Sequence, residues 1–331
     1  MRFLHVANGT CTTSIIEAAG IPGLRSQWAD PLNEGPVPAG LSDEALVAVR
    51  ERFLVGPDAN LEHEHENSLR TWRAAIDRHE SYDEVILWFE HDLFDQLNLI
   101  QLLTWIRGRV PAAKTVSLVC VGSFPGRPAF KGLGELAPDE LASLIETRRP
   151  VSEAQYALAA RVWNAFRAPD PEDLDRLWRS DLQALPFLSA ALRRFLEEYP
   201  WTGDGLSRSE RRLLELADPG PTDLIAAFPR MHEGEKAYFI TDGSILSLAQ
   251  TLSRTTPALL TYDAGAPTAD QVLHGAVAVT NAGRDVLAGR LDRIATCGLD
   301  RWYGGVHLRG NGPMWRWDDQ AERIRKAESP S

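Results

Sequence analysis

Two hydrophobic patterns alternate along the first 137 residues. Short apolar runs that end in polar residues or glycine predict four strands, at residues 2–7, 24–29, 84–89 and 115–121. Apolar residues at helical spacing predict helices at 42–56, 61–79 and 95–108. Ser14–Glu17 has capping-box spacing and opens another helix, unless that helix already begins at Thr10–Thr13. Because strands that alternate with helices are typical of a doubly wound, mostly parallel sheet, we predict an α/β domain over residues 1–137.

Two further segments follow this domain. Residues 138–200 have an entirely helical pattern, broken at 169–172, and predict a helical linker or subdomain over 138–204. Beyond it, a capping box at Ser207–Glu210 opens a helix, and further helices are expected at 221–228 and 242–254. Two β-like runs, at 258–262 and 276–280, precede a final helix around 283–292. Three helices followed by a two-stranded wing predict a winged-helix-like domain with a Trp-rich tail over residues 205–331.

Composition excludes several classes of protein. The chain has 331 residues, 44% hydrophobic and 24% charged, which is ordinary for a globular protein. Its three cysteines form no Cys-x-x-Cys pair, so a zinc ribbon or a disulfide framework is not indicated. No apolar run is long enough to span a membrane, and the N-terminus lacks a signal-peptide core. We therefore expect a cytoplasmic protein with no membrane partner.

Candidate chemistry gathers where the predicted strands end. The third strand passes directly from an apolar run into Glu90-His91-Asp92, with Asp95 one helical turn further on. The other strand ends contribute more polar groups: His5, Asn8, Gly9 and Thr10 from the first, Asp30 and Glu34 from the second, and Ser123 from the fourth. In open α/β sheets, ligands bind at the carboxyl ends of the strands. We therefore predict one crevice lined by all four ends.

The residue types at these ends limit the chemistry. Carboxylates with imidazole can hold a divalent metal ion and activate water, or can act as an acid–base pair. We assign candidate catalytic roles to four residues: His5, Glu90, His91 and Asp92. Candidate ligand-binding residues are Asn8, Gly9, Thr10, Asp30, Glu34 and Ser123. The segment Asn8–Thr10 at a helix start suits an anion, although it matches neither a Walker loop nor the Rossmann glycine fingerprint. Whether a metal is bound stays open.

Each candidate also has a purely structural interpretation. His5 lies inside an apolar strand and is equally typical of a core histidine. Asp30 and Glu34 can rigidify the proline-rich loop that they flank, and Asp92 has the position of a helix cap. Two other segments are ambiguous. Glu62–Glu66 alternates acid with histidine and favours a solvated helix face. His307 and Arg316 in the tail either pack locally or reach the crevice.

Several motifs resemble one bacterial family. His5-Val-Ala-Asn-Gly9, the segment from Asp30 to Pro36 and the segment from Leu87 to Leu97 resemble the family called domain of unknown function eighteen thirty-five. Later runs, at 205–210 and 300–308, resemble the C-terminal half of its longer members. The resemblance covers most of the chain but implies no particular chemistry. It coincides with the polar ends of the predicted strands.

Three functions are compatible with the sequence. The favoured one is an enzyme, a hydrolase or transferase, acting on a small phosphorylated or nucleotide-like ligand with or without a divalent metal. The second is a ligand-responsive DNA-binding regulator. Arg254 is the only basic residue of its recognition helix at 244–254, so nucleic acid is not a favoured partner. The third is a non-catalytic interaction protein, such as a homodimer built on some of the ten tryptophans.

Overall fold

The computed structural model describes residues 1–55, 69–265 and 272–327. The chain divides into two compact units. Unit 1 comprises residues 1–192 together with Trp302–Val306, and unit 2 comprises the remainder. The segment 138–204, set apart in the sequence as a linker or subdomain, therefore lies mostly in unit 1.

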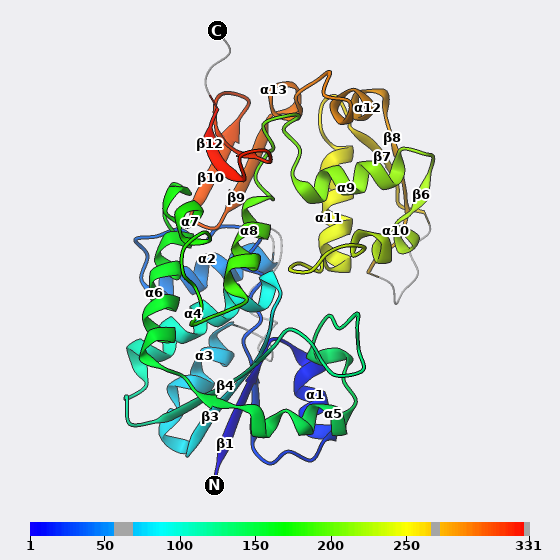
Figure 1. Cartoon of the computed structure of the whole chain (residues 1–331). Helices are drawn as coiled ribbons and strands as arrows, with labels where there is room; N and C mark the ends of the chain where they lie inside the picture. Colours follow the sequence, from blue (N-terminus) through cyan, green and yellow to red (C-terminus); the bar gives the residue numbers. More distant parts are fainter. Residues whose placement is uncertain (56–68, 266–271, 328–331) are drawn as a thin grey trace. The chain divides into compact units, whose positions relative to one another are not determined.

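Unit 1 is built on a five-stranded sheet (Figure 1). Its strands are β1 (Phe3–Ala7), β2 (Leu24–Gln27), β3 (Glu84–Glu90), β4 (Thr115–Val121) and β5 (Arg149–Pro150), in the order β2-β1-β3-β4-β5. The first four run parallel, and β5 pairs antiparallel with Ser117 and Leu118 of β4. This confirms the predicted mixed α/β class and mostly parallel sheet.

Helices lie on both faces of this sheet. Helices α1 (Thr10–Ala18) and α5 (Pro138–Ser143) lie on one side of the strands, and α3 (Leu69–Asp77), α4 (Leu93–Arg109) and α6 (Glu153–Phe166) on the other (Figure 1). Successive side chains of β3 point to opposite faces of the sheet and so contribute to the hydrophobic core on each face. Ile86 and Trp88 pack with Ile16 and Leu141 in one buried cluster, while Val85, Leu87 and Phe89 point the opposite way. All seven residues of β3 are buried, which explains its continuous apolar sequence.

The structure decides between two predicted starts of the first helix and corrects one expectation for unit 1. The first helix begins at Thr10, with Gly9 as its N-cap residue, which confirms the earlier of the two starts and not the capping box at Ser14–Glu17. The segment 138–200 is not entirely helical, because Arg149 and Pro150 form the short edge strand β5 between α5 and α6. Proline cannot donate to a sheet, and an edge position tolerates it. Helix α2 (Asp43–Val55) precedes α3, and helices α7 (Glu172–Leu177) and α8 (Leu188–Leu196) follow α6.

Unit 2 begins with a helical and β-sheet region. Its elements follow in the order α9 (Arg208–Ala217), β6 (Thr222–Asp223), α10 (Leu224–Met231), α11 (Asp242–Ser253), β7 (Leu260–Asp263) and β8 (Ala276–Val279). The three strands form an antiparallel sheet in the order β6-β8-β7. The predicted capping box at Ser207 is confirmed. The Ser207 side chain accepts from the Glu210 N–H, and the Glu210 side chain accepts from the Ser207 N–H.

The C-terminal part of the chain contains two short helices and two hairpins. These are α12 (Asn281–Leu287), α13 (Arg293–Cys297), β9 (Leu299–Tyr303) with β10 (Val306–Gly310), and β11 (Trp315–Asp318) with β12 (Arg323–Lys326). Trp317 is fully buried and forms a β-bridge with Trp201. The last hairpin therefore packs into unit 2 through its tryptophan.

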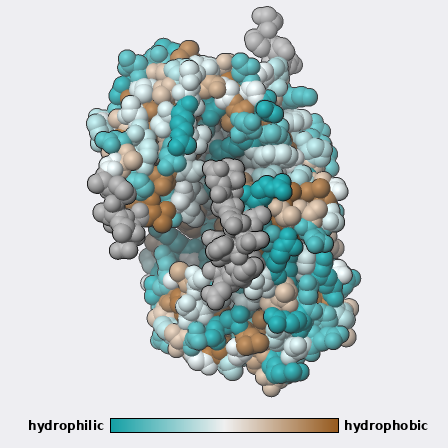
Figure 2. Space-filling model, turned by 180° about the vertical axis from the view of Figure 1, so that it is seen from behind, coloured by the Kyte–Doolittle hydropathy of each residue, from teal (hydrophilic) through white to brown (hydrophobic). Residues whose placement is uncertain are grey.

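The surface is mixed in polarity. Figure 2 shows small, scattered apolar patches among polar atoms on one face. Exposed large apolar side chains in the described residues include Leu24 and the sequence neighbours Phe53 and Leu54 in unit 1, and Ile225 in unit 2. None of the helices in the described part of the chain has both the length and the apolar character needed to cross a membrane.

Candidate active site

The candidate site lies where the strand order of the sheet reverses. The chain proceeds from β1 to β2 on one side and continues with β3 on the other side of β1. The carboxyl ends of β1 and β3 therefore flank the topological switch point, where open α/β sheets bind ligands. Asn8 follows β1, and Glu90 ends β3. A hydrogen bond from Asn8 Nδ2 to Asp95 Oδ2 (2.7 Å) crosses this point.

Three carboxylates gather at the end of β3. Glu90, Asp92 and Asp95 each place one ligand atom within 4.8 Å of the others. Their exposed fractions are 5%, 8% and 0%. Asp95, which was noted in the sequence only as a neighbour of the trio, is therefore the most buried member of the cluster.

The start of α4 fixes two of these carboxylates. Asp92 is the N-cap residue, and its Oδ1 accepts from the Asp95 N–H (2.9 Å), as the structural interpretation of Asp92 predicts. Asp95 in turn accepts from the Glu90 N–H (2.7 Å) as well as from Asn8. Thr12 donates to Asn8 Oδ1 (3.1 Å) and so fixes the orientation of the amide. Asn8 therefore positions a carboxylate, a role that the sequence did not suggest.

Glu90 is held by the segment that contains Gly132 and Leu133, where the sequence pattern indicates no site residue. The Leu133 N–H donates to Glu90 Oε1 (2.5 Å). The adjacent Gly132 lies so close that an added Cβ would stand 2.2 Å from Glu90 Oε2. The only local signal in the sequence is the glycine itself, because a close approach of backbone to a side chain requires one.

Burial changes the ionisation of the whole cluster. Burial, together with the charge of Asp92, raises the pKa of Glu90 to about 8. Burial raises the pKa of Asp92 to about 6 and that of Asp95 well above its usual range. Among the described residues, no lysine or arginine forms an ion pair with any of the three. The cluster is therefore short of positive charge, which a proton or a cation would supply.

Cys120 borders the cluster without joining it. Its Sγ lies 3.7 Å from the Glu90 carbonyl oxygen. Burial, with the charges of Asp95 and Glu90, raises the pKa of its thiol to about 12. The thiol stays protonated at neutral pH, so the site offers oxygen ligands rather than a thiolate.

Gly132→Ala is expected to disturb Glu90 selectively. The new methyl group would overlap the carboxylate and force it away from its position beside Asp92. We expect about tenfold weaker divalent-cation binding, which is roughly 1.4 kcal/mol, measured by isothermal titration calorimetry. Gly108→Ala is the matched control, since an added Cβ at Gly108 meets no heavy atom within 4 Å. Equal cation affinity in both variants would contradict this role of Gly132.

His5 lies away from the carboxylates, inside the sheet. Its ring is fully buried, Nδ1 accepts from Trp88 Nε1 (3.1 Å) and Nε2 contacts the Pro22 carbonyl oxygen (3.2 Å). These partners assign the proton to Nε2. Burial lowers the pKa of His5, which favours the neutral ring. The structure thus places His5 as a satisfied core histidine, the structural alternative noted for it in the sequence.

Asp30 is bound by a residue that the strand-end pattern did not indicate. Arg50 of α2 donates to Asp30 through Nε (3.0 Å) and Nη2 (2.6 Å), and both side chains are buried. Arg50 also donates to the carbonyl oxygens of Glu34 (2.6 Å) and Pro31 (3.0 Å). Asp30 thus rigidifies the proline-rich loop, and the Glu34 backbone takes part in the same arrangement.

The remaining candidates follow three different strands of the sheet, β1, β3 and β4. His91 is half-buried, and its ring stacks on Phe130 at 6.4 Å and meets Phe187 edge-on at 6.1 Å. Thr10 is exposed at the start of α1, beside the N-cap residue Gly9. Ser123 is exposed just beyond β4.

The two ambiguous segments have different outcomes. Glu62–Glu66 lies outside the described residues. In unit 2, His307 Nε2 bonds Asp300 Oδ1 (2.7 Å) and Arg316 Nη2 bonds Asp292 Oδ1 (2.9 Å). Both tail residues thus have local carboxylate partners, as the structural interpretation of the tail expects.

Comparisons with known proteins add no further assignment. No model of a known protein family matches the chain, and no curated protein matches it.

Proposed function

We propose that unit 1 is an enzyme that uses Glu90, Asp92 and Asp95 with a divalent cation to act on a small phosphorylated or nucleotide-like ligand. The observation that carries this proposal is the buried three-carboxylate cluster at the switch point of the sheet. Buried carboxylates are costly unless a proton, a counter-ion or a metal neutralises them. Motifs 5–9 and 87–97, which resemble the bacterial family, contain Asn8 and all three carboxylates.

The donor set fits a hard cation. Only carboxylate oxygens converge, which suits Mg²⁺ or Mn²⁺ better than a thiolate-preferring metal. Such a cation would relieve the mutual repulsion that helps to raise the pKa of Glu90. When bound, it would activate a water molecule and neutralise charge on a phosphoryl group.

The start of α1 supports a phosphorylated ligand. Gly9 provides no side-chain cap, and no acidic residue lies in the first turn of α1. The first N–H groups and the positive end of the helix dipole are therefore suited to an anion. Asn8 links this helix start to Asp95 (2.7 Å), so the anion and the cation would be neighbours. His91, directly after Glu90, is the candidate for proton transfer.

A cation titration tests this proposal. We expect Mn²⁺ to bind wild-type protein in isothermal titration calorimetry, and ATP with Mg²⁺, the nucleotide probe, to raise the melting temperature further. Glu90→Gln is expected to lose both responses, because it removes a ligand charge. Asp139→Asn, at an exposed acid in the first turn of α5, is the control and should behave as wild type. A wild-type protein that does not respond to Mn²⁺ would overturn the metal-assisted function.

The order of elements in unit 2 favours a second candidate function there. We infer a winged-helix-like module from the order α9-β6-α10-α11-β7-β8 and the sheet order β6-β8-β7. The exposed positions of α11 are Asp242, Gly243, Ser247 and Thr251, and Arg254 follows at its C-cap. A surface with so few basic groups fits a protein partner better than a phosphate backbone.

We therefore expect no DNA binding by the whole chain. Fluorescence anisotropy with a labelled mixed-sequence duplex, at low and at physiological salt, provides the measurement. Affinity that falls steeply with salt would instead favour the ligand-responsive regulator. Arg254→Ala would then be expected to reduce that salt slope, which identifies the helix responsible.

A further inference from the structure

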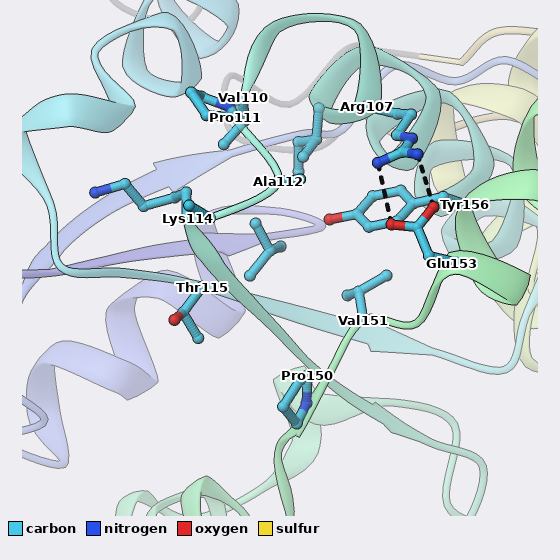
Figure 3. A pocket seen from close by; sticks show the side chains of 13 residues that line it. Arg107, Val110, Pro111, Ala112, Lys114, Thr115, Pro150, Val151, Glu153 and Tyr156 are labelled. Atoms are coloured by element: carbon cyan, nitrogen blue, oxygen red, sulfur yellow. Dashed lines mark hydrogen bonds and ion pairs between the residues drawn. The ribbon is translucent and has the colours of Figure 1, made fainter.

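A cavity of unit 1 lies at the opposite strand ends from the carboxylate cluster. It has a volume of about 260 Å³ and lies beside Thr115, the first residue of β4 (Figure 3). Its walls are of mixed polarity, and their apolar side chains include Val110 and Pro111 after α4 and Val151 before α6. The polar lining includes Arg107, Glu153 and Tyr156.

Arg107 holds a carboxylate at the edge of this cavity. Its Nη1 and Nη2 atoms contact the two carboxylate oxygens of Glu153 at 3.1 Å and 2.7 Å, the paired geometry drawn in Figure 3. Both side chains are well exposed, at 48% and 71%. An ion pair this exposed contributes little to stability, so another carboxylate can replace Glu153 at little cost.

Tyr156 adds a hydrogen-bond donor to the same space. Figure 3 shows its hydroxyl directed into the space between Ala112, Lys114 and Val151. In the described part of the chain, no group bonds this hydroxyl. Burial raises the pKa of Tyr156 to about 12, so the group remains a neutral donor at neutral pH.

Arg107 is the lining cation that a ligand carboxylate could reach, because Lys114 is engaged elsewhere. The ammonium group of Lys114 donates to the Tyr82 carbonyl oxygen and, in Figure 3, turns away from the cavity. Glu153 therefore occupies the place that a ligand carboxylate would take. The apolar side chains among the lining residues, such as Val110 and Val151, offer contact to an uncharged body.

We propose that this cavity binds a small carboxylate with an apolar body, which replaces Glu153 at Arg107 and accepts a hydrogen bond from Tyr156. The site is separate from the proposed active site, because it lies at the amino end of β4 whereas the carboxylate cluster lies at the carboxyl end of β3. Helix α4 joins the two, since Asp92 caps its start and Arg107 lies near its end.

Benzoate is a suitable probe for this site. Glu153→Gln removes the internal competitor while keeping its shape, and we expect it to bind benzoate about fivefold more tightly than wild type, measured by saturation-transfer NMR titration. Arg107→Gln is expected to abolish the binding. Benzamide, which has the same ring without the charge, should bind equally to wild type and Glu153→Gln.

Two controls keep the outcome decisive. Glu172→Gln removes an exposed carboxylate of α7 that pairs with Arg176, and it should leave benzoate affinity unchanged. Circular dichroism establishes that each variant is folded. The proposal is overturned if Glu153→Gln binds benzoate no more tightly than wild type, or if benzamide gains as much as benzoate. The gain in affinity cannot arise from unfolding, so a loss of structure would not imitate the expected result.

Discussion

Asp92→Asn is expected to stabilise the cation-free protein at about pH 8 and to abolish its response to divalent cations. Burial raises the pKa of Asp92 to about 6, from an ordinary value near 4 in the unfolded chain. As pH rises between these values, the unfolded state loses this proton more readily than the folded state. The ionisation of Asp92 therefore lowers the free energy of unfolding progressively between about pH 4 and about pH 6, and the full destabilisation is present above about pH 6.

Asparagine removes the charge but keeps the structure of the helix start. Its amide oxygen can still accept from the Asp95 N–H, since asparagine is as good an N-cap residue as aspartate. A pKa displaced by about two units corresponds to roughly 2–3 kcal/mol. For a chain of this size we expect a gain in melting temperature of about 4 °C or more.

The measurement is thermal unfolding with EDTA, compared at about pH 5 and about pH 8, and then with added Mn²⁺. The melting temperature of Asp92→Asn should exceed that of wild type by more at about pH 8 than at about pH 5. Wild-type protein should recover stability with Mn²⁺, whereas Asp92→Asn should not. An Asp92→Asn variant that is less stable than wild type at about pH 8, and that still responds to Mn²⁺, would show that Asp92 is only a helix cap.

The sequence predicted the part of this site that depends on strand position. Continuous apolar character located β3, and its abrupt end placed Glu90 and Asp92 at the sheet edge. The parallel sheet then brought the end of β1 beside them, as the bond between Asn8 and Asp95 shows. These features follow from the periodicity of strands and from the short connections of α/β folds, both of which are local in sequence.

Long-range pairing was beyond the sequence pattern. Asp30 also follows a strand, yet Arg50 binds it from a helix 20 residues further along. Nothing in periodicity tells which of several charges will be buried together. Leu133 reaches Glu90 from a segment with no regular pattern, and only tertiary packing brings them together. The edge strand at Arg149 and Pro150 was missed because two residues are too few to show alternation.

Arg50→Met is expected to destabilise the folded protein strongly. Arg50 and Asp30 are 0% and 1% exposed, so removing the guanidinium leaves a buried carboxylate without its counter-ion. Breaking a buried pair in this way typically costs about 3–5 kcal/mol. Methionine retains most of the apolar volume, which limits the contribution of an empty cavity. Urea unfolding followed by tryptophan fluorescence would measure the loss.

Two comparison variants separate the buried pair from ordinary charge effects. Arg25→Met breaks an ion pair with Glu17 whose side chains are 29% and 67% exposed, and it should cost less than about 1 kcal/mol. The double variant Arg50→Met/Asp30→Leu should recover part of the lost stability, because it removes the stranded carboxylate as well. A cost for Arg50→Met no larger than that for Arg25→Met would contradict the structural role of the pair.

The loss of stability in Arg50→Met should also include contacts other than the ion pair with Asp30. Arg50 fixes the loop through the carbonyl oxygens of Pro31 and Glu34, and the same loop donates from the Val37 N–H to Gly304 (2.8 Å). Gly304 lies in the turn between β9 and β10, and an added Cβ there would stand 2.4 Å from the Phe166 carbonyl oxygen. Releasing the loop therefore weakens the hydrogen bond from Val37 that holds this turn within unit 1. Faster hydrogen exchange at Val37 in Arg50→Met, with unchanged exchange in β3, would locate the effect in the loop rather than in the sheet.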